Sequence, residues 1–241
     1  MPIGTVARRR RLKPGVMPLR NAGMQIEAER LSYWFLRLNG FLTTVNFVVH
    51  PGVGRDQGTD VDILGVRFPW RGEVIEEPMQ DSPAFTGVVD RPYFVIAEVK
   101  TGLCDLNGPW SRPERGNLQQ VLAAVGFCSR DDLDTVAQAL YQTGQVSGSG
   151  YFASLLCLGE RRNPQLHQRF PAVPQITWPE VLGFIHNRFW KYRSRKVSHE
   201  QWDVSGHQLW NAVAASRGHA EQFIRSVDVV PTTRQHARDE A

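Results

Sequence analysis

Two apolar segments that carry charged residues constrain this chain more than any other feature. Thr59–Phe68 and Tyr93–Thr101 are rich in β-branched and aromatic residues and are bracketed by turn formers, so each is predicted to be a strand. Unpaired charges inside a sheet are costly, so charged residues there need one another, a metal ion or solvent at a cleft. The charged residues in question are Asp60, Asp62, Glu98 and Lys100.

The predicted elements around these strands indicate an α/β fold, in which helices flank a mixed sheet. A helix is expected from Met24 to the Asn39-Gly40 stop, followed by a strand over Phe41–Val49. The stretch Pro69–Arg91 is long for a hairpin loop, and we expect it to cover or border the site. The remaining predictions are helices Asn117–Cys128 and Ser129–Gln142, strand Tyr151–Leu158, a helix opened by the capping-box spacing Thr177–Glu180, a helix from Ser198 to about Ser216, and a short helix His219–Val227 before a polar tail.

Length and composition set outer limits on the class of protein. The chain has 241 residues, and none of its apolar runs approaches the roughly 20 residues that a membrane span needs. The basic N-terminus has no apolar core, which argues against a secretory signal, and three widely spaced cysteines suit buried thiols in a reducing cytoplasm. We therefore expect a cytoplasmic protein without a membrane partner. Its expected parts are a flexible basic arm (1–22), a core (23–165) and a helical C-terminal extension (166–241).

Basic residues gather in two places, although the net charge of +4 is mild. The first 20 residues are basic with no acid, and a second cluster near residue 190 interleaves basic with aromatic residues. Such clusters suit a polyanionic partner through phosphate contacts and base stacking. The alternatives are a solubilising terminus and an amphipathic helix end with solvated arginines. The candidate nucleic-acid-binding residues are Arg188, Lys191, Arg193, Arg195 and Lys196.

The charged strands together predict a site for phosphodiester hydrolysis. Side chains two apart on a strand share a face, so Glu98 and Lys100 point the same way. If strand pairing brings Asp62 beside Glu98, two carboxylates and the Val99 carbonyl suit Mg²⁺, with Mn²⁺ as a substitute. The ion can polarise a water molecule into a nucleophile, and Lys100 can orient this water or stabilise charge on the phosphate.

The pattern Asp62…Glu98-Val99-Lys100 resembles the Asp…Glu-x-Lys signature of the PD-(D/E)xK nuclease superfamily, in particular its resolvase-like and small restriction-like members. The resemblance covers roughly residues 24–158. It implies a restriction-endonuclease-like core and a Mg²⁺-dependent nuclease that acts on DNA rather than RNA, with an endonuclease favoured over an exonuclease. A resolvase or type II restriction role would favour a homodimer.

The same resemblance adds accessory residues. Relatives carry a helical glutamate about eleven positions before a Gly-aromatic pair; Glu29 stands there, with Glu27 in reserve, and it supplies an extra acid. Glutamines on the helix after the lysine often face the site, which makes Gln119 and Gln120 candidates, while Asp60 is a neighbour that tunes it. The chain departs from the family in a longer insertion between the strands and in everything after about residue 165, so the substrate stays open.

Less specific readings exist for each motif. Asp60 and Asp62 also suit half-buried acids at a strand entrance, and Glu98 with Lys100 suits an ion pair at a sheet edge. Glu29 also suits a first-turn acid that complements the helix dipole. Two other functions therefore stay open: a catalytically weak or inactive nucleic-acid-binding module of the same fold in a defence or repair complex, and a small-molecule hydrolase or structural protein with chance acids.

Overall fold

A computed structural model of the chain describes residues 23–49, 59–72, 77–194 and 203–232. The predicted basic arm, 1–22, lies outside these residues. Among the described residues, no helix is long and apolar enough to cross a membrane.

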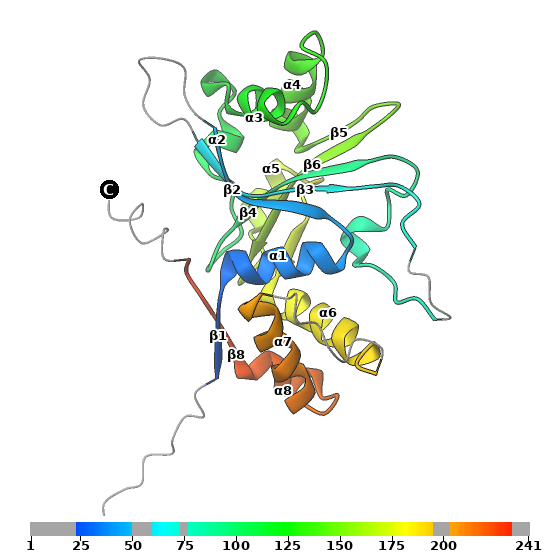
Figure 1. The fold of residues 1–241 in the computed structure, drawn as a ribbon. Helices are drawn as coiled ribbons and strands as arrows, with labels where there is room; N and C mark the ends of the chain where they lie inside the picture. Colours follow the sequence, from blue (N-terminus) through cyan, green and yellow to red (C-terminus); the bar gives the residue numbers. More distant parts are fainter. Residues whose placement is uncertain (1–22, 50–58, 73–76, 195–202, 233–241) are drawn as a thin grey trace, which may run out of the picture.

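A six-stranded mixed sheet forms the centre of the molecule, in the order β2-β3-β4-β6-β5, with β7 also paired to β6 (Figure 1). The pairs β2–β3, β3–β4 and β5–β6 are antiparallel, whereas β4–β6 and β6–β7 are parallel. The predicted mixed sheet is therefore confirmed, and so are the two charged strands. The bounds are β2 Leu42–Val49, β3 Thr59–Arg67, β4 Tyr93–Val99, β5 Gln145–Ser147, β6 Phe152–Gly159 and β7 Gln175–Thr177.

Helices cover both faces of this sheet, and each face has its own hydrophobic cluster (Figure 1). We call the two sides the α1 layer and the α3 layer. The α1 layer holds α1 (Ala28–Leu38), α6 (Trp178–Lys191), α7 (Val204–Ala215) and α8 (Ala220–Ser226), and the α3 layer holds α2 (Gly108–Ser111), α3 (Asn117–Val125), α4 (Leu133–Thr143) and α5 (Pro164–Arg169).

Strand β4 is buried on both faces, which explains its nearly continuous apolar sequence. Val95 and Ala97 pack in the α1 layer, whereas Phe94 and Ile96 pack in the α3 layer. Because side chains alternate along a strand, this register directs the Glu98 side chain toward the α3 layer.

The two ends of the described chain pair with each other, which local sequence patterns do not indicate. Strand β1 (Met24–Glu27) runs parallel to β8 (Val227–Val230). The predicted helix start at Met24 is therefore wrong by four residues, and the predicted polar tail begins with a strand. Ile26 of β1 is buried in the core of the α1 layer, and this tertiary contact outweighs local helix propensity.

The segment expected as a C-terminal extension packs into the same core as α1. Leu209, Val213 and Phe223 belong to the hydrophobic cluster that contains Trp34 of α1 and Phe189 of α6. The predicted capping box is confirmed, because the Thr177 main-chain N–H donates to Glu180 Oε2 over 2.8 Å. In addition, the expected loop 160–175 contains the short helix α5.

The described residues of the long insertion lie at the end of the sheet opposite the charged pair. Antiparallel pairing places Arg67 opposite Tyr93, where the insertion leaves β3 and enters β4. Phe85, in a 3₁₀ turn (Pro83–Phe85), is fully buried against aromatic rings that include Phe41. The expectation that this stretch covers or borders the site is therefore wrong for 69–72 and 77–91.

Candidate active site

Asp62 and Glu98 meet where β3 and β4 begin to separate. The last paired residues of the two strands are Ile63 and Ala97, so the next position of the register sets Asp62 against Glu98. The main-chain N–H of Val99 donates to Asp62 Oδ2 over 2.7 Å. Asp62 is 9% exposed and Glu98 is 2% exposed. The structure thus brings together two carboxylates that lie far apart in the sequence.

A local irregularity directs the Asp62 carboxylate toward β4. Regular alternation would place Val61 and Ile63 in one layer, but Val61 packs in the α3 layer and Ile63 in the α1 layer. On β2, Asn46 has a left-handed φ of +53°, between residues that pair regularly with β3. Non-glycine residues adopt this conformation only when the surrounding structure holds them there. The irregularity lets Asp62 accept the Val99 N–H, which regular pairing would give to a main-chain carbonyl.

Both oxygens of the Glu98 carboxylate accept hydrogen bonds from neighbouring side chains. Lys100 Nζ lies 2.8 Å from Oε1 and also donates to Asn107 Oδ1 over 2.6 Å. Trp110 Nε1 donates to Oε2 over 2.5 Å, and this indole is almost fully buried in the α3 layer. Sequence reasoning missed Trp110 and Asn107, although a tryptophan in the loop directly after a charged strand was a usable signal.

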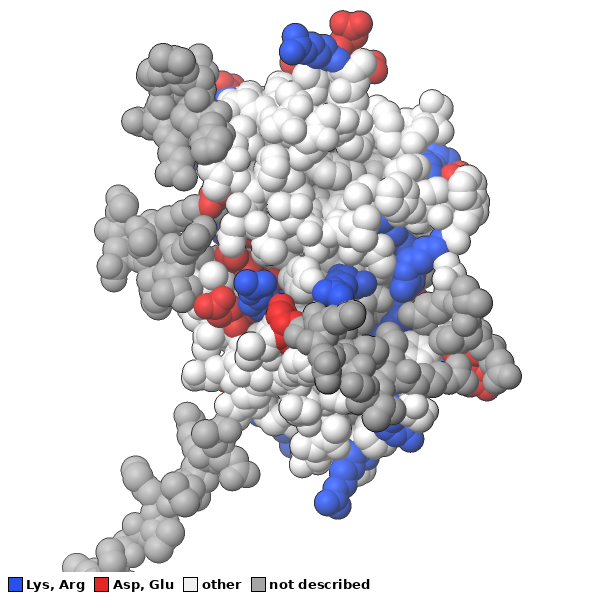
Figure 2. All heavy atoms as spheres, in the orientation of Figure 1, with Lys and Arg blue, Asp and Glu red and all other residues white. Residues whose placement is uncertain are grey.

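Glu29 is the third carboxylate of the site, and it comes from the first turn of α1. Burial, followed by the charge of Asp62, raises its pKa to about 7, while hydrogen bonding by the Asn46 side chain opposes this rise. Sequence reasoning did not identify Asn46. In Figure 2, acidic side chains and a basic one gather on the left of the molecule, level with the N-terminal end of α1 in Figure 1.

The carboxylates of the strands are also poorly solvated. Burial, followed by the charge of Glu98, raises the pKa of Asp62 to about 7, and burial raises the pKa of Glu98. The charge of Asp60 contributes to both rises, which places this half-buried residue within electrostatic reach of the site. Burial alone would lower the pKa of Lys100, but Glu98 and Asp62 outweigh burial and raise it. Lys100 is therefore an ammonium ion at neutral pH.

The two candidate glutamines differ from the carboxylates in what they contact. Gln119 Nε2 donates to Asp134 Oδ1 of α4 over 3.4 Å, so its amide faces α4. Gln120 is half-buried on α3, and no described hydrogen bond links its side chain to the carboxylates. The structure does not bring either glutamine into the group formed by Asp62 and Glu98.

The predicted basic–aromatic segment divides into a buried and an exposed part. Arg188 is fully buried, and its Nη2 lies 2.9 Å from Asp81 Oδ1. Arg188 is therefore wrong as a nucleic-acid contact, because the helix directs it into the core. Lys191 and Arg193 are exposed, and the Arg193 guanidinium lies 4.0 Å from the Trp190 ring centroid. Arg195 and Lys196 lie outside the described residues.

We expect Arg188→Leu to lower the free energy of unfolding by about 2 kcal/mol, since it leaves part of a buried carboxylate interaction unmade. The loss stays below that of a fully broken pair because Arg67 and Arg71 also contact Asp81. Urea unfolding measures the change. Arg193→Leu is the control and is expected to change stability by less than about 0.5 kcal/mol. Equal losses in the two variants would contradict the assignment of Arg188 to the core.

The donor set fits a magnesium ion that is shared with substrate, rather than a site made by protein alone. Among the described residues, no three His, Cys, Asp or Glu side chains are grouped closely enough to hold a metal ion. Mg²⁺, however, is commonly bound by one or two carboxylates, water and substrate phosphate oxygens. Asp62 Oδ2 accepts the Val99 N–H, whereas no described hydrogen bond engages Oδ1. In a strand the N–H and C=O of one residue point the same way, so the Val99 carbonyl faces the Asp62 side.

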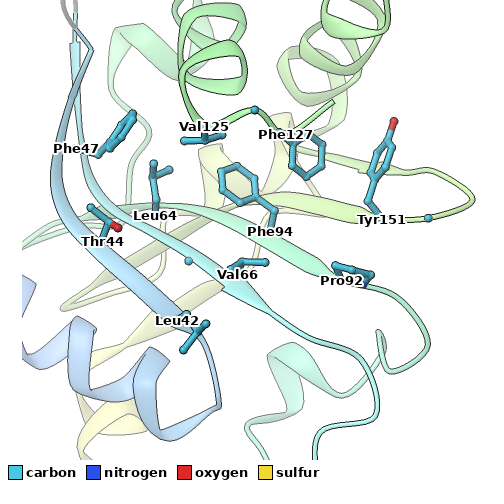
Figure 3. A pocket seen from close by; sticks show the side chains of 13 residues that line it. Leu42, Thr44, Phe47, Leu64, Val66, Pro92, Phe94, Val125, Phe127 and Tyr151 are labelled. Carbon is cyan, nitrogen blue, oxygen red and sulfur yellow. The ribbon is translucent and has the colours of Figure 1, made fainter. Parts of the chain in front are cut away.

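An apolar pocket of about 450 Å³ lies on the α3-layer face of the sheet, away from the carboxylates (Figure 3). Phe47, Phe94, Phe127 and Tyr151 contribute aromatic rings to its wall. None of its lining residues is an acid or a base, so the pocket has no group for proton transfer or metal binding. The chemistry of the chain is therefore to be sought at Asp62 and Glu98.

Comparison with protein-family models, with curated proteins and with solved structures finds no match for this chain. A functional assignment therefore depends on the arrangement of the residues described above.

Proposed function

We propose that this chain is a divalent-metal-dependent nuclease that hydrolyses phosphodiester bonds in DNA, with endonucleolytic cleavage favoured. One observation carries the proposal: Asp62, Glu98 and Lys100 come together at the ends of two central strands, and the pKa values of both acids are raised. Buried carboxylates with raised pKa values in such a group are typical of functional sites. The helix-flanked mixed sheet is compatible with a restriction-endonuclease-like core.

In this proposal Asp62, Glu98 and the Val99 carbonyl hold Mg²⁺, or Mn²⁺ in its place, and Glu29 assists. A bound ion of this kind lowers the pKa of water and offsets negative charge on a phosphate. Lys100 is an ammonium ion, so it donates hydrogen bonds to the attacking water or to a phosphate oxygen and does not accept a proton. Trp110 fixes the orientation of Glu98 through its indole N–H.

The direct test is cleavage of DNA by the purified full chain. Duplex, single-stranded and branched DNA, and RNA, are incubated with Mg²⁺ or Mn²⁺ and with a chelator. We expect metal-dependent cleavage of at least one DNA form, abolished by Asp62→Asn and unaffected by Glu221→Gln, an isosteric change at an exposed site on α8. The proposal is wrong if no form is cleaved, or if Asp62→Asn cleaves as well as the unchanged chain.

A second function, nucleic-acid binding with little or no catalysis in a defence or repair complex, is favoured by one observation. Both Glu98 oxygens already accept hydrogen bonds from Lys100 and Trp110, which competes with a metal ion for this carboxylate. Salt-sensitive DNA binding without cleavage, unchanged by Asp62→Asn, would support this function.

We expect Trp110→Phe to lower the kcat of DNA cleavage roughly tenfold with little change in KM, because groups that orient metal ligands act at this scale. Steady-state kinetics on one DNA substrate measure both constants. Trp178→Phe is the matched control, because no described group accepts a hydrogen bond from the buried Trp178 indole. A change in KM alone would place Trp110 in substrate binding instead.

A further inference from the structure

The C-terminal strand brings Thr232 beside Glu29. In the parallel pairing of β1 with β8, Glu27 is opposite Val230. Helix α1 begins directly after Glu27, so Glu29 lies in its first turn. Thr232 follows β8 by two residues and is near enough to Glu29 to lower the pKa of its carboxyl group. Pairing between the ends of the described chain thus adds a C-terminal residue to the surroundings of the site.

The Thr232 hydroxyl has no hydrogen-bond partner among the described residues, although the residue is only 7% exposed. A buried polar group without a partner costs about 1–3 kcal/mol. Buried hydroxyl groups of this kind are normally satisfied by protein, by water or by a ligand. This hydroxyl lies beside a carboxylate, which itself donates no hydrogen bond when ionised. The arrangement leaves room in its chemistry for a group that attracts oxygen atoms from both.

Glu29 is held from a second direction by Asn46. The Asn46 side chain hydrogen-bonds to Glu29 from β2, and its left-handed backbone conformation is one that asparagine tolerates better than most residues. Glu29 also lies close enough to Asp62 for their charges to interact. Two carboxylates and a neutral hydroxyl, from α1, β3 and the segment after β8, therefore surround one region.

We infer that a second divalent cation, Mg²⁺ or Mn²⁺, binds between Glu29 and Asp62, with the Thr232 hydroxyl as a neutral ligand. The inference rests on the proposed function, because Asp62 is shared with the first metal ion. Carboxylate and hydroxyl oxygens are the hard ligands that these ions prefer, and the ion offsets the mutual repulsion of the acids. The C-terminal strand is then a functional part of the site. A water molecule is the competing occupant.

Titration of the full chain with Mn²⁺, followed by electron paramagnetic resonance and calorimetry, tests the inference. We expect a second Mn²⁺ ion per chain whose affinity falls roughly tenfold in Thr232→Val, while the affinity of the first ion stays the same. Thr232→Ser keeps the hydroxyl and is expected to bind both ions as the unchanged chain does. Thr86→Val, at an exposed threonine whose hydroxyl donates to Pro83, is the control for the substitution itself.

Glu98→Gln separates this inference from the proposed function. It is expected to weaken the first ion and to leave the second ion and its sensitivity to Thr232→Val in place. Binding of a single Mn²⁺ ion that ignores Thr232→Val would overturn the inference, with water as the occupant, and would leave the proposed nuclease standing. Absence of any Mn²⁺ binding would overturn both. Circular dichroism of each variant establishes that a lost ion reflects a lost ligand rather than unfolding.

Discussion

Lys100→Met is expected to lower the rate of Mg²⁺-dependent DNA cleavage by about 10²- to 10³-fold. Removing one preorganised group that stabilises charge in a transition state typically costs this much. Lys100 is held in place by Glu98 and Asn107, so its ammonium ion is already oriented before substrate arrives. Single-turnover cleavage of the best DNA substrate, with enzyme in excess, measures the effect on the chemical step.

The control for Lys100→Met is Arg225→Met, which removes a cation from an exposed i,i+4 pair on α8 and should leave the rate unchanged. Methionine keeps most of the length of the lysine side chain, so packing near Glu98 is largely preserved. A rate within about threefold of the unchanged chain would contradict the role of Lys100 as a group that stabilises charge. A loss that appears only as weaker DNA binding would assign Lys100 to affinity rather than to the chemical step.

Strands β3 and β4 could be predicted because their information is local. Each is a short apolar run between turn formers, and the charges at Asp62 and Glu98 stand out against that background. The register that sets them side by side follows from antiparallel pairing of neighbouring strands, which is the commonest arrangement for consecutive strands. The place of Glu29 followed from a resemblance, and the structure puts its carboxylate close to Asp62.

The features that sequence reasoning missed depend on contacts between distant parts of the chain. The β1–β8 pair joins the two ends of the described chain, and the four residues of β1 read as a helix when seen alone. Arg188 looked like a surface cation because its neighbours are basic, yet its partner Asp81 lies in the insertion. Asn46 has an ordinary strand sequence around it, and its left-handed conformation depends on the irregular pairing with β3.

The second large effect concerns stability, and its sign is opposite to that of most substitutions. Asp62 has a pKa of about 7 in the folded chain, compared with an ordinary value of 3.8. The folded state therefore binds this proton more tightly than the unfolded state does. Its contribution to stability is fully present below about pH 4 and is lost as the pH rises through 7. Glu29, whose pKa is also about 7, acts in the same direction.

We therefore expect Asp62→Asn to stabilise the metal-free chain at pH 8 and to leave its stability almost unchanged at pH 5. A shift of about three pKa units corresponds to an upper limit of roughly 4 kcal/mol, and a measured gain on the order of 2 kcal/mol is expected because neighbouring acids titrate together. Asparagine keeps an oxygen that can accept the Val99 N–H, so the fold is preserved. Urea unfolding with a chelator present, at several pH values between 5 and 9, measures the difference.

Mg²⁺ should reverse this order of stability. A cation that binds only the folded state stabilises it by mass action, and it offsets the repulsion between Asp62 and Glu98 that destabilises the metal-free chain at pH 8. Millimolar Mg²⁺ is therefore expected to raise the unfolding midpoint of the unchanged chain at pH 8 and to leave that of Asp62→Asn where it was. If Asp62→Asn is destabilised at pH 8 without metal, the carboxylate is a structural partner of Val99. If it is stabilised there and Mg²⁺ has no effect on the unchanged chain, the buried acids are real but their counter-ion is not a divalent metal. Only stabilisation by asparagine together with stabilisation of the unchanged chain by Mg²⁺ agrees with a metal-dependent nuclease site.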